Sequence, residues 1–91
     1  MTKKIEQSTL ENLKFLCYDI VIGEMIDQET MSKVKHLVEN RLNNGGYKIE
    51  KVKCDEENNP PDLVDSGQMK IEIWEEVMLG SSEKKIHTII L

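Results

Sequence analysis

The chain has 91 residues, of which 38% are hydrophobic and 32% charged, and its formal net charge is −5 at pH 7. This length supports one hydrophobic core, and the composition is that of a folded protein rather than a disordered segment. Nucleic-acid binding is not expected, because phosphate contacts need clustered basic residues and the chain has a single arginine, Arg41. The apolar runs are far shorter than the roughly 20 residues of a transmembrane helix, and no secretory signal is recognisable. We therefore expect a cytoplasmic protein without membrane insertion.

The first helix is expected after a short polar segment. Residues 1–7 show no sustained period and are expected to form a flexible N-terminal segment. Ser8 and Glu11 have the spacing of a capping box, which predicts that a helix begins near Thr9. Apolar residues then recur every three or four positions, the pattern of a helix with one buried face. This stripe comprises Leu10, Leu13, Leu16, Cys17, Ile20 and Val21.

A second helix is expected between two glycine-containing segments. Gly23 suits a left-handed end for the first helix, and Asp27 or Thr30 can cap the start of the second. The run Asn43–Gly46 predicts its end. The apolar side of this helix comprises Met31, Val34, Leu37, Val38, Arg41 and Leu42.

Three strands follow. Residues 47–54 alternate imperfectly, which predicts a bulge near Glu50 and Lys51. Residues 68–78 alternate cleanly, with Met69, Ile71, Ile73 and Val77 on one face. Residues 79–83 have the length of a hairpin connection, and residues 85–91 form a last strand whose two faces both contain isoleucine, so either Ile89 or Ile90 can face the core. The whole of residues 1–91 is thus predicted to be one α+β domain, a two-layer sandwich with two N-terminal helices packed on a three-stranded, mainly antiparallel sheet.

Residues 55–67 form a polar loop between the first two strands. Pro60 and Pro61 restrict its backbone, and asparagine side chains can bond nearby backbone groups, so we expect a defined shape. Its acidic residues could offer oxygen ligands to Ca²⁺, but they lack the spacing of a dedicated calcium loop. A solvated acidic turn is favoured, and no metal or cofactor is expected.

Catalysis is not expected either. A nucleophile and a base could be drawn from Cys54 and His87, or from Ser81 or Ser82 with a histidine. Nothing in the sequence brings such a pair together with an oxyanion donor. Cys17 and Cys54 fit no metal-binding or redox spacing and are interpreted as reduced, small apolar residues.

The segment from Val52 to Met69 resembles the C-terminal domain of contractile tail sheath proteins of bacteriophages and related injection machines. The likeness lies in a strand, a Cys-Asp-x-x-Asn-Asn-Pro-Pro loop over residues 54–61, an Asp-x-Gly turn over residues 65–67 and a following strand. In layout it covers residues 8–91. The resemblance implies a structural module of a virion or contractile injection system. Its partners would be other copies of itself or other tail proteins, joined into an oligomer by β-augmentation.

The residues expected to contact other subunits come from the loop and the strands. The resemblance points to Asp55, Asn58, Asn59, Pro60 and Pro61 in the loop. The last strand has only Lys84 and Lys85 to protect its apolar edge, so Ile86, Thr88 and Ile90 are expected where this strand or its neighbour is completed by a second polypeptide.

Trp74 favours an alternative interpretation. It lies on the polar face of its strand beside Glu72 and Glu76, and tryptophan is a frequent interface anchor. The chain could then be a free-standing small phage or bacterial adaptor or regulatory protein that binds one protein partner. Equally, Trp74 could fold over a sheet edge or under the loop as a structural residue.

Overall fold

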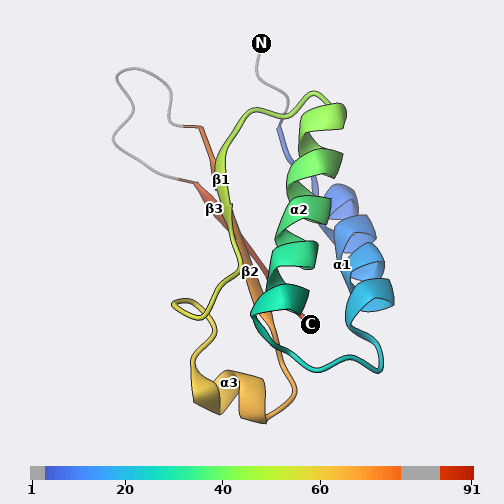
Figure 1. Cartoon of the computed structure of the whole chain (residues 1–91). Helices are drawn as coiled ribbons and strands as arrows, with labels where there is room; N and C mark the ends of the chain where they lie inside the picture. The colour runs from blue at the N-terminus through green and yellow to red at the C-terminus, as the bar shows by residue number, and fades with distance from the viewer. Residues whose placement is uncertain (1–3, 77–84) are drawn as a thin grey trace.

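A computed structural model describes residues 4–76 and 85–91 of the chain. The elements in chain order are α1 (Gln7–Val21), α2 (Gln28–Asn44), β1 (Ile49–Lys53), α3 (Pro61–Asp65), β2 (Lys70–Glu75) and β3 (Ile86–Ile90). This confirms the predicted α+β class: two N-terminal helices are followed by a three-stranded antiparallel sheet, against which they pack (Figure 1). The short helix α3 was not predicted. Figure 1 places it at one end of the molecule, between β1 and β2.

The sheet has the order β1-β2-β3. Pairing of β1 with β2 shifts between Ile49 and Lys51, which confirms the bulge predicted near Glu50. Pairing of β2 with β3 is regular, and Trp74 lies opposite Ile86. Because β2 occupies the centre, β1 and β3 form the two outer edges of the sheet that the structure describes.

The start of α1 differs from the prediction. The helix begins at Gln7 after Glu6, whose side chain makes no capping hydrogen bond, so the capping box expected from Ser8 is not formed. Ile5 lies in the segment expected to be flexible, yet it is 5% exposed and belongs to the core. Anchoring of this side chain directs the backbone into the helix without a polar cap.

The remaining helix ends follow simple backbone chemistry. Gly23 has a φ of +76°, the left-handed conformation predicted for it. Asp27 caps α2 by accepting a hydrogen bond from the Thr30 N–H at 2.9 Å.

Arg41 was predicted to lie in the apolar stripe of α2, but it is exposed beside the buried Leu42. Its charged guanidinium stays in water, so the buried face of the helix is narrower than predicted.

The core lies between the helix layer and one face of the sheet. α2 packs against β1, and α1 lies beside β3. On β3 the core residue is Ile89, at 4% exposure, whereas Ile90 points away at 46%, which decides between the two phases left open by the sequence. The core residues are Ile5, Leu13, Cys17, Met31, Val34, Val38, Leu42, Val52, Cys54, Met69, Ile71, Ile73 and Ile89. Val77 and the predicted connection over residues 79–83 lie outside the described residues.

Candidate protein-interaction site

The face of the sheet opposite the helices carries Trp74 near the end of the central strand β2. Trp74 is half-buried and is paired across the sheet with Lys51 on β1 and Ile86 on β3. The Lys51 Nζ lies 4.3 Å from the centre of the indole ring, within range of a cation–π contact. The ring of Trp74 on the central strand is therefore in contact with a side chain of the edge strand β1.

Three predicted contact residues share this face on the outer strand β3. Ile86 is 41% exposed and Ile90 46%, and Thr88 lies exposed between them. On β2, Ile86 lies opposite Trp74, Thr88 opposite Glu72, and Ile90 opposite Lys70. The structure thus brings together on one open face Trp74, Ile86, Thr88 and Ile90.

The backbone of β3 has an unpaired side. Glu75 N–H donates to the Lys85 carbonyl and Leu91 N–H donates to the Met69 carbonyl, so the odd-numbered residues of β2 bond to β3. Alternation along an antiparallel ladder then sets which residues of β3 bond outward. The N–H and C=O groups that point away from β2 belong to Ile86, Thr88 and Ile90. No described residue forms a further strand beside them.

A groove of about 240 Å³ runs between this edge and α1. Leu10, Glu11 and Lys14 line it from the helix, and Thr88 and Ile90 line it from the strand. Its lining is mixed, because Leu10, Ile89 and Ile90 are aliphatic whereas Gln7, Glu11, Lys14 and Thr88 are polar. A polypeptide added to β3 would therefore meet α1 as well as the strand.

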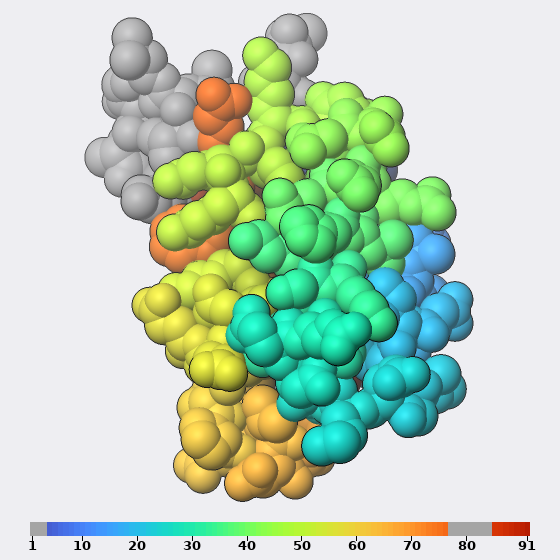
Figure 2. Space-filling model, in the orientation of Figure 1, coloured from blue at the N-terminus to red at the C-terminus, as the bar shows by residue number. Residues whose placement is uncertain are grey.

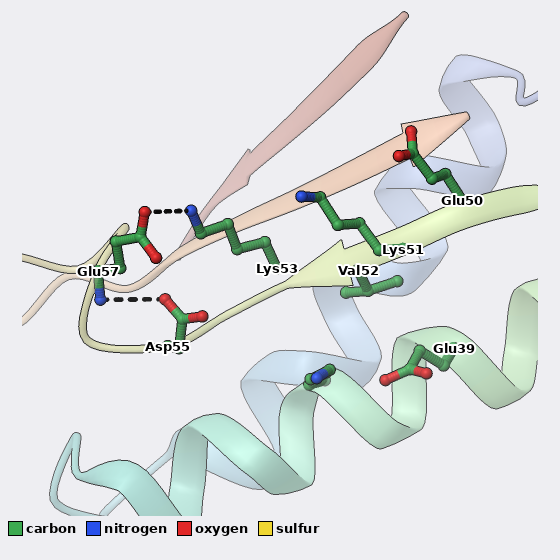
Figure 3. A pocket seen from close by; sticks show the side chains of 8 residues that line it. Glu39, Glu50, Lys51, Val52, Lys53, Asp55 and Glu57 are labelled. Atoms are coloured by element: carbon green, nitrogen blue, oxygen red, sulfur yellow. Dashed lines mark hydrogen bonds and ion pairs between the residues drawn. The ribbon is translucent and has the colours of Figure 1, made fainter. Parts of the chain in front are cut away.

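The opposite edge of the sheet is different in character. β1 and α2 lie side by side in Figure 2, and the groove between them, about 340 Å³, is shown from close by in Figure 3. Lys53 Nζ is 3.0 Å from Glu57 Oε1 along this edge. The lining residues are Lys35, Glu39, Glu50, Lys51, Val52, Lys53, Asp55 and Glu57. Charged side chains and a bulge are features that oppose strand pairing, so β1 is the less suitable of the two edges for adding a strand.

The loop after β1 is held by two asparagine side chains. Asn59 is 3% exposed; its Nδ2 donates to the carbonyls of Asp55 and Lys70, both at 3.0 Å, and its Oδ1 accepts from the Lys70 N–H at 2.6 Å. Asn58 Nδ2 donates to the Lys53 carbonyl at 2.9 Å, and its Oδ1 accepts from the Asp55 N–H at 2.9 Å. These bonds tie the end of β1 to the start of β2.

This internal bonding changes the interpretation of the predicted loop contacts. Asn59 is buried, so its side chain is not offered to a partner, and Asn58 is largely engaged with backbone groups. Asp55 Oδ1 is also engaged within the loop, because it accepts a hydrogen bond from the Glu57 N–H at 3.0 Å. Pro60 and Pro61 are exposed at the start of α3, whereas Asp55 and Asn58 are partly buried.

The residues considered for catalysis or metal binding lie apart. Cys54 is on the β1 side and His87 on β3, with β2 between them. Burial raises the pKa of the Cys17 and Cys54 thiols to about 12, so both are protonated at neutral pH. His87 Nε2 instead lies 3.5 Å from Glu75 Oε1. Within residues 4–76 and 85–91 no three His, Cys, Asp or Glu side chains are grouped to hold a metal ion, and Ser81 and Ser82 lie outside these ranges.

Sequence reasoning missed the outer side of α1. The exposed fraction is between 41% and 79% for Phe15 and Tyr18 on α1, for Ile22 at its C-cap and for Met25 in the segment after it. The signal was present, because residues 15, 18 and 22 are separated by three and four positions and so share a face opposite the buried stripe. The groove residues Glu11 and Lys14 were likewise recognised only as lying outside that stripe.

The helices among the described residues are too short or too polar to cross a bilayer. Comparisons of the chain with protein-family models, with curated proteins and with solved structures gave no match.

Proposed function

We propose that this chain is an assembly module that binds another polypeptide by strand addition along the free edge of β3. The observation that carries the proposal is the outward-facing backbone of Ile86, Thr88 and Ile90, combined with the exposed side chains of the two isoleucines. Unpaired N–H and C=O groups on an apolar outer strand are the template used in β-augmentation.

The assembly favoured by the sequence is a contractile phage tail or a related injection machine. Support comes from the resemblance of residues 52–69 to tail sheath C-terminal domains and from the order of two helices followed by three strands. The partners would be neighbouring subunits or other tail proteins. The chain would be made in the host cytoplasm and pass into the virion.

A free-standing adaptor that binds one partner is the second candidate. Trp74 supports it, because the ring is partly exposed on the open face beside Ile86. The contact with Lys51 covers part of that ring, which makes the edge of β3 the stronger binding feature. Co-purification of one protein in a fixed ratio, without large particles, would favour the adaptor.

The test uses Thr88, whose N–H points away from β2. Thr88→Pro removes that outward donor and leaves the hydrogen bonds to β2 in place. Thr88→Val is the matched control, because it keeps the N–H and a β-branched side chain. In cells that produce the natural assembly, a tagged Thr88→Val chain should enter large particles like the wild type, and a folded Thr88→Pro chain should not. Equal incorporation of the two variants would show that the β3 edge is not the assembly contact.

A further inference from the structure

We infer that the occupant of the β3 edge, when the chain is alone in solution, is a second copy of the same chain. The two β3 strands pair antiparallel about a two-fold axis that passes between their Thr88 residues, and so join two three-stranded sheets into one. This inference rests on the strand addition proposed above and identifies the partner and its register.

The hydrogen-bonding pattern fits this register. Thr88 is the midpoint of β3, which spans Ile86–Ile90. With Thr88 opposite Thr88, Ile86 of each copy faces Ile90 of the other, so every outward-facing residue meets an outward-facing residue. The pairing forms about six backbone hydrogen bonds. A shift by one residue would set outward groups against groups already bonded to β2.

The side chains are self-complementary in the same register. On the open face, the exposed Ile86 and Ile90 cover each other across the new strand pair, and Thr88 meets Thr88. Apolar pairs and threonine pairs are favourable cross-strand neighbours, and no like charges face each other. The edge of β1 cannot do the same, because its bulge breaks the register and Lys51 and Lys53 flank its centre.

The helix layer adds complementary charge. The groove beside Thr88 is lined by Glu11 and Lys14, both on the side of α1 that faces the strand edge. A two-fold axis perpendicular to the sheet brings the α1 helices of the two copies together antiparallel. Glu11 of each copy then lies beside Lys14 of the other, which gives two opposite-charge contacts above the joined strands.

Sedimentation equilibrium of the purified chain tests the association. We expect a reversible monomer–dimer equilibrium between micromolar and millimolar concentrations. Thr88→Pro should raise the dimer dissociation constant at least about tenfold, and Thr88→Val should change it less than about threefold. Lys14→Glu should weaken the dimer by placing like charges together, and the double variant Glu11→Lys with Lys14→Glu should restore it. Circular dichroism confirms that each variant is folded.

Disulfide trapping tests the register. Facing Cα atoms in a hydrogen-bonded antiparallel pair are about 5.5 Å apart, within the range of a disulfide. Thr88→Cys should therefore form a covalent dimer on oxidation. Ile86→Cys alone should not, whereas a mixture of Ile86→Cys and Ile90→Cys chains should. The natural Cys17 and Cys54 are 0% and 1% exposed and give no background.

Two results would overturn the inference. One is a purified wild-type chain that stays monomeric at every concentration; the other is cross-linking of Ile86→Cys alone as efficiently as Thr88→Cys. If the chain is monomeric and Thr88→Pro still blocks its entry into particles, the two-fold pairing is wrong and strand addition to a different partner stands. If Thr88→Pro also enters particles normally, both proposals are wrong.

Discussion

Asn59 joins distant parts of the backbone through one side chain. Its amide bonds to Asp55 and, eleven residues away, to both the N–H and the C=O of Lys70. The prolines limit the backbone conformations of the loop. The buried Asn59 side chain goes further, because its hydrogen bonds hold Asp55 and Lys70 at fixed positions relative to each other. The residue therefore supports the end of the sheet where Lys70 also faces Ile90.

Replacing Asn59 by Ala should destabilise the protein. The change removes the hydrogen bonds of Asn59 to the Asp55 carbonyl and to the N–H and C=O of Lys70, of which the Lys70 carbonyl keeps only a longer bond from Asn58. The expected loss is about 2–4 kcal/mol in the free energy of unfolding. Urea titration followed by circular dichroism measures it. Asn12→Ala on the exposed side of α1 is the control and should change stability by less than about 0.5 kcal/mol. A loss no larger than that of the control would contradict the role given to Asn59.

The two buried thiols make stability depend on alkaline pH. Burial raises the pKa of Cys17 and Cys54 from 9.0 to about 12. Between those values the unfolded chain releases thiol protons that the folded chain keeps, so the free energy of unfolding falls as the pH rises. Below pH 9.0 this contribution does not vary.

Replacing both Cys17 and Cys54 by Ala should flatten that dependence. The slope of the free energy of unfolding against pH should be less steep than in the wild type, by at most about 1.4 kcal/mol per pH unit for each thiol. Chemical denaturation at several pH values between 9.0 and 12 gives both slopes, even though the alanines also lower stability at every pH. Two parallel curves would mean that the thiols ionise in the folded protein as they do in the unfolded chain.

At the scale of the elements, the sequence pattern predicted those features that are determined by residues close together in the chain. The period of the apolar residues gave both long helices, and the change of phase before Val52 gave the bulge at Glu50. The start of α1 was missed because it depends on burial of Ile5 rather than on a polar cap. The five-residue helix α3 is too short to show a period, and its position follows from two prolines at its start.

The residues of the proposed interaction surface could be named from the sequence, but their arrangement could not. Ile86, Thr88 and Ile90 were identified from their strand, yet alternation could not say which face was buried, since isoleucine occurs in both phases. The bonds from Asn58 and Asn59 to Lys70 cross eleven or more residues, and such contacts leave no local pattern. The groove with α1 likewise depends on tertiary packing.

The cap of α2 should respond to acid. The backbone hydrogen bond from Thr30 holds the pKa of the Asp27 carboxyl below its ordinary value of 3.8. The stabilisation is therefore present above that pH and is lost as the pH falls through the folded-state pKa. Asp27→Ala should lower the thermal unfolding midpoint at neutral pH, and the gap to the wild type should narrow in acid. Asp27→Asn keeps a capping oxygen that does not titrate and should show little loss at neutral pH; a loss as large as that of alanine would exclude the cap as the cause.

The loop over residues 55–67 should be as rigid as the strands it connects. The side chains of Asp55, Asn58 and Asn59 make hydrogen bonds within the loop and join it to β1 and β2. Amide ¹⁵N relaxation should give order parameters of about 0.85, the value of rigid backbone. Values below about 0.6 would mean that these bonds do not persist in solution.

At the scale of the whole molecule, the two sheet edges differ in the regularity of their backbone and in their charge. β3 is regular and apolar, and β1 is interrupted at Glu50 and flanked by Lys51 and Lys53. Deleting Glu50 and replacing both lysines by Thr should allow the β1 edge to pair with a strand of another chain. Light scattering should then show species larger than a dimer, and a variant that stays at the size of the wild type would show that the bulge and the lysines do not protect this edge.

In the proposed assembly, the bulge at Glu50 would leave each chain with one edge that can pair. A protomer whose two sheet edges can both pair binds two further chains. Successive additions would then produce a ribbon of indefinite length with the repeat of a cross-β fibre. A protomer with a single edge that can pair binds one further chain, and the assembly then stops growing. If the proposed strand addition is correct, one extra residue in β1 separates a closed complex from an open polymer.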